Sequence, residues 1–276
     1  MIKKQISGVA FIDLRKAFDT VDHELLVSKL ACIGCAKETL KWFKSYLTDR
    51  EQITHFKGTK SNPLTITMGV PQGSILGPLL FSIYVNSLPD CTSEGTVDMY
   101  ADDTTLTVSG NNVSEVEQKF TVALQKVMAR IKTNRLVLNS EKTCVMVTCS
   151  RATLKKCEAF NISVNGTVLK RVNVTKCLGV LIDEELNWSK HVDKVTKVTQ
   201  KNIGVIKRSK NYLPQKSMNL LYNTLVLPHF DYCSAIWSNR YQSQTIKLQK
   251  IQKRAARIIM NKTYETPSAE LFKSLK

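Results

Sequence analysis

Residues 97–108 read Val-Asp-Met-Tyr-Ala-Asp-Asp-Thr-Thr-Leu-Thr-Val, with two adjacent aspartates between two β-forming segments. Its first half alternates strictly, so apolar side chains share one face of a strand and polar side chains share the other. The β-forming composition resumes after the two aspartates and continues to Val108. The pattern therefore predicts a β-hairpin that carries Asp102 and Asp103 in its turn.

A second carboxylate-bearing strand lies near the start of the chain. Residues 8–12 form a short apolar run that ends at Asp13, as in a central strand. Each of these aspartates alone is typical of a solvated turn. Carboxylates that converge at the ends of strands would repel one another unless cations lay between them, and Mg²⁺ prefers such oxygen ligands. The candidate chemistry is phosphoryl transfer assisted by two metal ions.

The rest of the chain indicates two regions of different class. Before Trp188, helices are expected near residues 22–30, 38–47 and 114–134 and from about Ser74, with strands at 144–149 and 177–182 and a hairpin over 162–169 at Asn165-Gly166. After Trp188 the period is helical, through residues 192–206, from Pro214, and through 246–258. We expect a mixed domain of helices and strands followed by an all-helical one.

The charge distribution follows the same division. The chain of 276 residues has a formal net charge of +17, and residues 190–276 account for +13 of it, with 17 basic and 4 acidic residues. This excess favours a phosphate-rich partner, nucleic acid before membrane. No apolar run approaches the roughly 18 residues that span a bilayer, and the N-terminus lacks a signal-peptide pattern. We expect an intracellular protein of the cytoplasm or nucleus, with no membrane partner and no secretion.

Several motifs resemble a known family. FIDLRKAFDTVDH at 11–23, GVPQGSILGPLLF at 69–81 and YADD at 100–103 stand in the order found in reverse transcriptases. LVLNSEKT at 136–143, CLGVLIDEELNWSKHV at 177–192, LPHFDYCSAIW at 227–237 and KLQKIQKRAARII at 247–259 are similar to non-LTR retrotransposons of the jockey-like branch. Several motifs in the right order are far more specific than YADD alone.

The resemblance implies an α+β fold and a metal site. The fold is a reverse transcriptase palm over residues 1–188, an antiparallel ferredoxin-like sheet with helices on one face, followed by a helical, basic thumb over 189–276. Asp13 and Asp102 would be the principal ligands of two Mg²⁺ ions, with Mn²⁺ as the alternative. Asp103 would be the accompanying acid, and the backbone carbonyl of Leu14 a further ligand.

The resemblance also implies nucleotide and primer contacts. Phe18 would lie under the sugar and exclude a 2′-hydroxyl, Gln72 and Gly73 would contact the incoming nucleotide and template, and Lys142 would approach the leaving pyrophosphate. Leu178, Gly179 and Val180 would hold the primer end. Simpler explanations are a core Phe18, a solvated Lys142 and ordinary β packing at Leu178 and Val180.

Two functions from different classes remain open. The first is an RNA-directed DNA polymerase that adds a dNTP to a DNA 3′ end on an RNA template. The second is a catalytically inactive remnant that at most binds RNA or an RNA–DNA duplex. Only 12 residues precede Asp13, so we expect the fingers and endonuclease of the family to be missing. The element's own RNA, the missing N-terminal region or another polypeptide would then be partners. A third interpretation, a single-strand RNA-binding module, is disfavoured because the sheet face carries acids where such modules carry aromatic residues.

Overall fold

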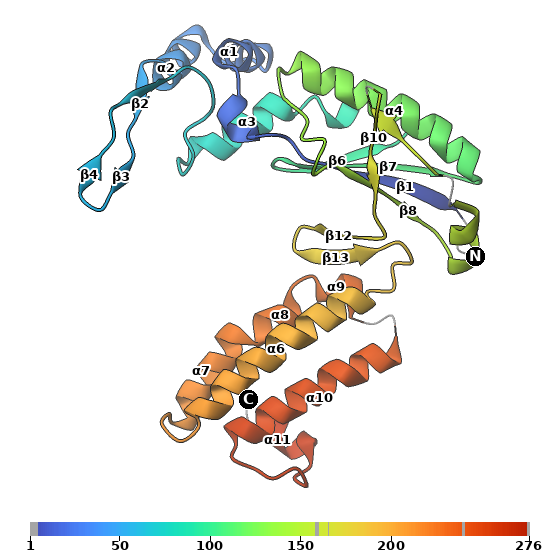
Figure 1. Ribbon diagram of the computed structural model, residues 1–276. Coiled ribbons are helices and arrows are strands. Elements are labelled where there is room, and N and C mark those ends of the chain that lie inside the picture. Colours follow the sequence, from blue (N-terminus) through green and yellow to red (C-terminus); the bar gives the residue numbers. More distant parts are fainter. Residues whose placement is uncertain (1–4, 158–159, 165, 239–240, 275–276) are drawn as a thin grey trace. The chain divides into compact units, whose positions relative to one another are not determined.

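The computed structural model describes residues 5–157, 160–164, 166–238 and 241–274 (Figure 1). The chain divides into two compact units, Met1–Asn173 and Val174–Lys276. This division lies earlier than the boundary near residue 188 that the charge shift indicates. The reason is hydrophobic packing, because Val180 and Trp188 are buried in the core of the second unit.

Five strands form the central sheet of the first unit, in the order β11-β8-β1-β7-β6. Neighbouring strands are antiparallel, except that β11 runs parallel to β8. Their bounds are β1 Ile6–Ile12, β6 Thr96–Tyr100, β7 Asp103–Gly110, β8 Cys144–Thr148 and β11 Lys170–Arg171. Helices lie between β1 and β6 and between β7 and β8, which gives the βαββαβ order of a ferredoxin-like sheet. The expected antiparallel ferredoxin-like sheet is confirmed.

Helices cover one face of this sheet. Residues along β1 are alternately buried and half-buried, so every second side chain enters the core. The long helix α4 buries Phe120, Leu124 and Val127 on its inner stripe and lies along the sheet (Figure 1). The helices of this unit are α1 His23–Cys32, α2 Lys37–Leu47, α3 Leu76–Val85, α4 Val113–Thr133 and α5 Arg151–Leu154, with single 3₁₀ turns η1 Ala17–Thr20, η2 Pro89–Cys91 and η3 Lys155–Cys157.

Side-chain caps fix where two of these helices begin. The Asn112 side chain accepts a hydrogen bond of 2.9 Å from the Glu115 amide at the start of α4. Asp22 does the same for α1, accepting from the Leu25 amide at 2.9 Å, and it also forms an ion pair with Arg135. Burial by itself would raise the pKa of Asp22, but the hydrogen bond from Leu25 and the Arg135 guanidinium outweigh it and lower that pKa.

Asp22→Ala is expected to lower the free energy of unfolding by about 1 kcal/mol, because α1 loses its N-cap. Asp22→Asn should cost less, since the amide oxygen can still accept from Leu25. The lowered pKa means that the Asp22 carboxylate stabilises the fold above its unfolded pKa of about 3.9, and that this contribution is lost as the pH falls through the lower folded value. Urea denaturation of the three proteins at pH 7 and pH 3 measures both effects. Equal stability of wild type and Asp22→Ala at pH 7 would contradict the capping role.

A two-stranded ribbon extends from the end of α2, in a region where the sequence carries no clear period. It consists of β2 Arg50–Gln52 paired with β5 Leu64–Ile66, and β3 His55–Phe56 paired with β4 Thr59–Lys60. Figure 1 shows the ribbon pointing away from the central sheet. Almost every one of these strand residues is exposed. Residues 50–66 are called the ribbon.

The hairpin expected over residues 162–169 is present. β9 Ser163–Val164 pairs with β10 Thr167–Val168. Gly166 has a φ of 80°, as a tight turn requires, whereas Asn165 lies outside the described residues.

The second unit has one β-hairpin and then helices only, among its described residues. β12 Val174–Cys177 pairs with β13 Val180–Asp183, so the single strand expected at 177–182 is instead interrupted by a turn at Leu178-Gly179. The helices are α6 Ser189–Ser209, α7 Gln215–Leu225, α8 Leu227–Asp231, α9 Ser234–Trp237, α10 Gln242–Ile259 and α11 Ser268–Ser274. In the ranges described, no helix is both long and apolar enough to cross a membrane.

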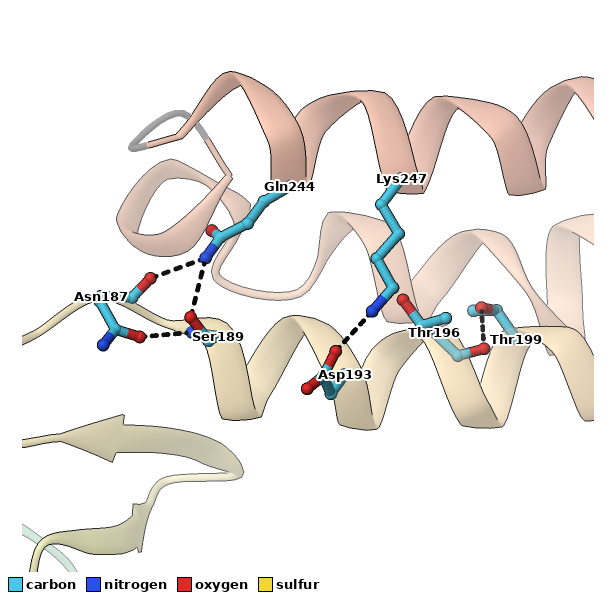
Figure 2. A network of polar contacts seen from close by, with 7 residues as sticks. All are labelled: Asn187, Ser189, Asp193, Thr196, Thr199, Gln244 and Lys247. Carbon is cyan, nitrogen blue, oxygen red and sulfur yellow. Dashed lines mark hydrogen bonds and ion pairs between the residues drawn. The ribbon is translucent and has the colours of Figure 1, made fainter.

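Polar contacts join α10 to the start of α6 (Figure 2). The Gln244 amide donates to the Asn187 carbonyl at 2.9 Å and to the Ser189 hydroxyl at 3.3 Å. One turn further along, Lys247 Nζ lies 2.5 Å from a carboxylate oxygen of Asp193. These contacts fix the register between the two helices, and they neutralise one of the lysines that the sequence places on the basic face of α10.

Candidate functional site

The β1 and β7 strands bring two aspartates to the same end of the sheet. The β1–β7 ladder ends where Ile12 faces Thr104, so Asp13 and Asp103 are the next residues along their strands. Ala101 and Asp102 form the two-residue turn between β6 and β7, and Asp103 is the first residue of β7. Ala101 has a φ of 54°, the left-handed conformation of a tight hairpin turn.

Hydrogen bonds from the segment after α4 hold Asp13 in place. The Asn139 side chain donates to Asp13 Oδ2 at 2.9 Å, and the Asn139 amide donates to the Asp13 carbonyl at 2.8 Å. The Asp13 amide donates to Thr143 Oγ1 at 3.2 Å. Asp13 is half-buried, so these bonds fix the direction in which its carboxylate points.

Asp13 and Asp102 line one open cavity of about 430 Å³. Asp103 is exposed and does not line this cavity. Three basic side chains, Arg15, Lys16 and Lys142, also line it. The remaining lining residues are Leu14, Ala17, Phe18, Gln72 and Asn139. Two carboxylates beside three cations suit a ligand that carries both metal ions and phosphates.

Phe18 has two environments. Its ring stacks on Phe81 of α3, with centroids 4.3 Å apart and an angle of 24° between the planes. The same half-buried side chain lines the cavity. Core packing therefore explains its position and leaves part of the ring for contact with a ligand.

The loop before α3 is tied to the segment after Asp13. The Gly69 amide donates to the Val21 carbonyl at 2.7 Å, and the Val70 amide donates to the Phe18 carbonyl at 2.9 Å. Gly69 has a φ of 91°, and a Cβ there would lie 2.8 Å from the Asp19 carbonyl oxygen, so this close approach requires glycine.

Gln72 and Gly73 lie at the exposed end of that loop. The side-chain amide of Gln72 donates to the Asp19 carboxylate at 2.7 Å, and Gln72 lines the cavity. Gly73 has a φ of 80° and is exposed, but it does not line the cavity. The structure therefore joins Gln72, Phe18 and Lys142 to the two carboxylates and places Gly73 beside them.

The predicted metal ligands fit a site completed by substrate rather than a closed protein cage. Within the described ranges, no group of three or more His, Cys, Asp or Glu side chains is arranged to hold a metal ion. Mg²⁺ is commonly held by one or two carboxylates together with waters and substrate phosphates. Asp13 and Asp102 provide two such carboxylates, and the buried Leu14 also lines the cavity.

The predicted primer-contact residues belong to the second unit. Leu178 and Gly179 form the β12–β13 turn with φ values of 45° and 87°. A Cβ at Gly179 would lie 3.3 Å from the Tyr232 ring, whose hydroxyl donates to the Leu178 carbonyl at 2.6 Å. Val180 is only 5% exposed and packs in the core of this unit. Local packing thus accounts for Gly179 and Val180, whereas the half-exposed Leu178 can contact a ligand.

Basic residues form one stripe along α6. Lys190, Lys194, Lys197, Lys201 and Arg208 follow spacings of 4, 3, 4 and 7 residues, and all are exposed. Such spacings place side chains on one helix face. On α10, by contrast, Lys247 pairs with Asp193, and Arg257 donates to the Thr266 carbonyl. The α6 stripe is therefore one basic surface of the second unit, and Lys250 and Arg254 of α10 are exposed as well.

Sequence reasoning missed Arg15, Lys16, Asn139 and Thr143. All four lie within the motifs quoted above, two within three residues after Asp13 and two within three residues of Lys142. Their closeness in the sequence to Asp13 or Lys142 could have indicated that they belong to the site.

The ferredoxin-like sheet, with Asp13 and Asp102 lining one cavity, is the arrangement expected of a polymerase palm. The family described as "Reverse transcriptase (RNA-dependent DNA polymerase)" matches residues 1–216, and the chain belongs to this family. Polymerases are among the enzymes that use paired divalent metals.

The relatives are non-LTR retrotransposon polymerases, as the motifs indicate. The chain is 29% identical over 282 residues to "Probable RNA-directed DNA polymerase from transposon BS" of Drosophila melanogaster, which covers 99% of the chain and 31% of the relative. It is 26% identical over 272 residues to "RNA-directed DNA polymerase from mobile element jockey" of Drosophila funebris, a match that covers 93% of the chain and 29% of the relative. Among solved structures, apo telomerase from Candida tropicalis matches with a TM-score of 0.47 and 12% identity, over 93% of the chain and 47% of that protein. The chain spans less than a third of the length of the two retrotransposon relatives.

Proposed function

We propose that the chain is the palm and thumb portion of a non-LTR retrotransposon reverse transcriptase, which adds a dNTP to a DNA 3′ end on an RNA template. The observation that carries the proposal is the cavity that Asp13 and Asp102 share with Phe18, Gln72 and Lys142. Primer extension on an RNA template, with an Asp102→Asn variant run beside the wild type, tests it. Location in the cytoplasm or nucleus and the need for the element RNA or a further polypeptide belong to the same proposal.

In this mechanism Asp13 and Asp102 would hold two Mg²⁺ ions, or Mn²⁺, with Asp103 as the accompanying acid and the Leu14 carbonyl as a further ligand. The ions would activate the primer hydroxyl and stabilise charge on the phosphates. Asn139 and Thr143 keep Asp13 oriented, so little reorganisation is needed when substrate arrives. Phosphoryl transfer depends mainly on such positioning and electrostatic stabilisation.

The cations at the cavity wall would bind the triphosphate. Arg15 and Lys16 follow Asp13 and Leu14 in the sequence, and Lys142 lines the cavity from the segment before β8. Lys142 would offset charge on the leaving pyrophosphate or give it a proton. Gln72 and Gly73 would contact the nucleotide and template, and Leu178, Gly179 and Val180 would contact the primer.

Phe18→Ala is expected to raise the incorporation of ribonucleotides relative to deoxyribonucleotides by about tenfold or more, because space opens where a 2′-hydroxyl would lie. Phe43→Ala is the matched control, since Phe43 packs against the same core but is not among the lining residues of the cavity. Competition between ATP and dATP in primer extension measures the ratio. If both variants lose stability and neither changes the ratio, Phe18 is a core residue only.

The alternative function is a remnant that binds RNA or RNA–DNA duplex without catalysis. The α6 stripe favours binding by the second unit, and it is independent of the carboxylates. Binding of this kind weakens steeply with salt and does not require Asp102. Salt-insensitive binding, or none, would remove this alternative.

A further inference from the structure

The exposed side of α2 carries a column of stacked side chains. The rings of Trp42 and Tyr46 are parallel within 9°, with centroids 5.4 Å apart. The Arg50 guanidinium lies over the Tyr46 ring, 5.4 Å from its centroid. Trp42 is nevertheless 53% exposed. The column therefore presents a large aromatic surface to solvent on a rigid helix.

The tip of the ribbon repeats this chemistry. Phe56 is 68% exposed, and Lys57 Nζ lies 5.4 Å from the centroid of its ring. Lys57 and Gly58 form the β3–β4 turn, both with positive φ. This short turn places Phe56 near the end of the ribbon, and Phe56 does not belong to either hydrophobic core.

Charge and polarity indicate what these rings bind. Residues 37–68 contain six Lys or Arg against three Asp or Glu, and they are rich in Thr and Ser. Aromatic rings interleaved with cations are the usual surface for single-stranded nucleic acid, in which bases stack on the rings and cations neutralise phosphates. An apolar partner would instead use the aliphatic side chains of the same ribbon, such as Leu64, which is 74% exposed.

The ribbon leads directly to the carboxylate cavity along the chain. After β5 the backbone reaches Gly69 and Val70, which are hydrogen-bonded to the segment after Asp13. Two residues later Gln72 lines the cavity. A nucleic acid strand bound to the ribbon would therefore be bound by the same unit that carries Asp13 and Asp102.

We propose that α2 and the ribbon form a binding surface for single-stranded RNA, on which bases stack against Trp42 and Phe56, separate from the carboxylate cavity. That this RNA is the unpaired part of the template rests on the proposed polymerase function. Binding itself does not.

The test uses the full chain and a fluorescein-labelled, unstructured 20-nucleotide RNA of mixed sequence. Trp42→Ala and Phe56→Ala should each weaken binding by about tenfold, within the range measured for loss of one stacking ring. Trp42→Phe should retain most of the affinity because it keeps a ring. Leu64→Ala is the matched control, since it removes an exposed apolar side chain from the same ribbon and should leave affinity unchanged.

Tryptophan fluorescence gives a second readout. Trp188 and Trp237 are 8% and 1% exposed, so solvent-dependent emission comes from Trp42. Saturating RNA should quench this emission in the wild type and in Asp102→Asn, even if neither extends a primer. The proposal is overturned if both alanine variants bind RNA like the wild type, if Leu64→Ala weakens binding equally, or if RNA leaves the emission unchanged. A change of oligomeric state in Phe56→Ala without RNA, seen by light scattering with RNA affinity intact, would assign the surface to self-association instead.

Discussion

Asp102→Asn is expected to lower primer extension on an RNA template by about a thousandfold or more, because the lost carboxylate charge is what would hold the metal ions against the reacting phosphate. The substitution is nearly isosteric and lies in an exposed hairpin turn, where asparagine is well tolerated. The fold should therefore survive, and circular dichroism can confirm this. Asp13→Asn should have a similar effect on the rate, although it also alters the contact with Asn139.

Asp98→Asn is the matched control for this experiment. Asp98 is an exposed aspartate of the same hairpin, on β6, and does not line the cavity. It loses the same charge, so extension should remain near the wild-type rate. Asp103→Asn then tests the accompanying acid, which the structure places beside the turn but not at the cavity wall.

The outcomes separate the two proposed functions. A metal-dependent product in the wild type that disappears in Asp102→Asn supports the polymerase. An equal product from both proteins would contradict the assignment of Asp102. If the wild type yields no product but still binds RNA–DNA duplex, the chain is the non-catalytic remnant.

The sequence was sufficient to predict the sheet and the pair of carboxylates. Alternation around residues 97–103 predicted the β6–β7 hairpin, and the apolar run before Asp13 predicted β1, because both patterns follow from burial of one face or both faces of a strand. Asp13 and Asp102 converge because antiparallel pairing through β7 brings the end of β1 to that turn.

Other features lie outside what periodicity can show. The ribbon's strands are two or three residues long and exposed, so no buried face imposes an alternating pattern. The roles of Arg15 and Lys16 depend on the cavity formed with residues more than fifty positions away. Val180 was expected at the primer, and its burial in the core of the second unit could not be read from the motif alone.

Only some of the basic residues in the second unit are free to bind phosphate. Sequence alone spreads +13 over residues 190–276. In the structure Lys247 is paired with Asp193, and Lys194 donates to the Gly179 carbonyl at 3.1 Å. Three exposed lysines of the α6 stripe, Lys190, Lys197 and Lys201, are therefore candidates for phosphate contacts.

Replacing these three lysines by glutamine is expected to weaken binding of an RNA–DNA duplex by roughly tenfold to a hundredfold at low salt, because three phosphate contacts are lost. The slope of log affinity against log salt should also become shallower by about 3, since each contact contributes about 0.9. Fluorescence anisotropy between about 50 and 200 mM KCl measures both quantities.

The control must remove the same charge from another place. Lys119→Gln, Lys126→Gln and Lys132→Gln together do so on α4, in the first unit, and leave α6 intact. If the duplex responded only to the net charge of +17, both triple variants would bind equally weakly. A loss confined to the α6 variant instead means that the phosphates follow one helix face. That outcome would explain why acidic residues are so few there, because a single carboxylate in the stripe would repel the backbone that the lysines bind.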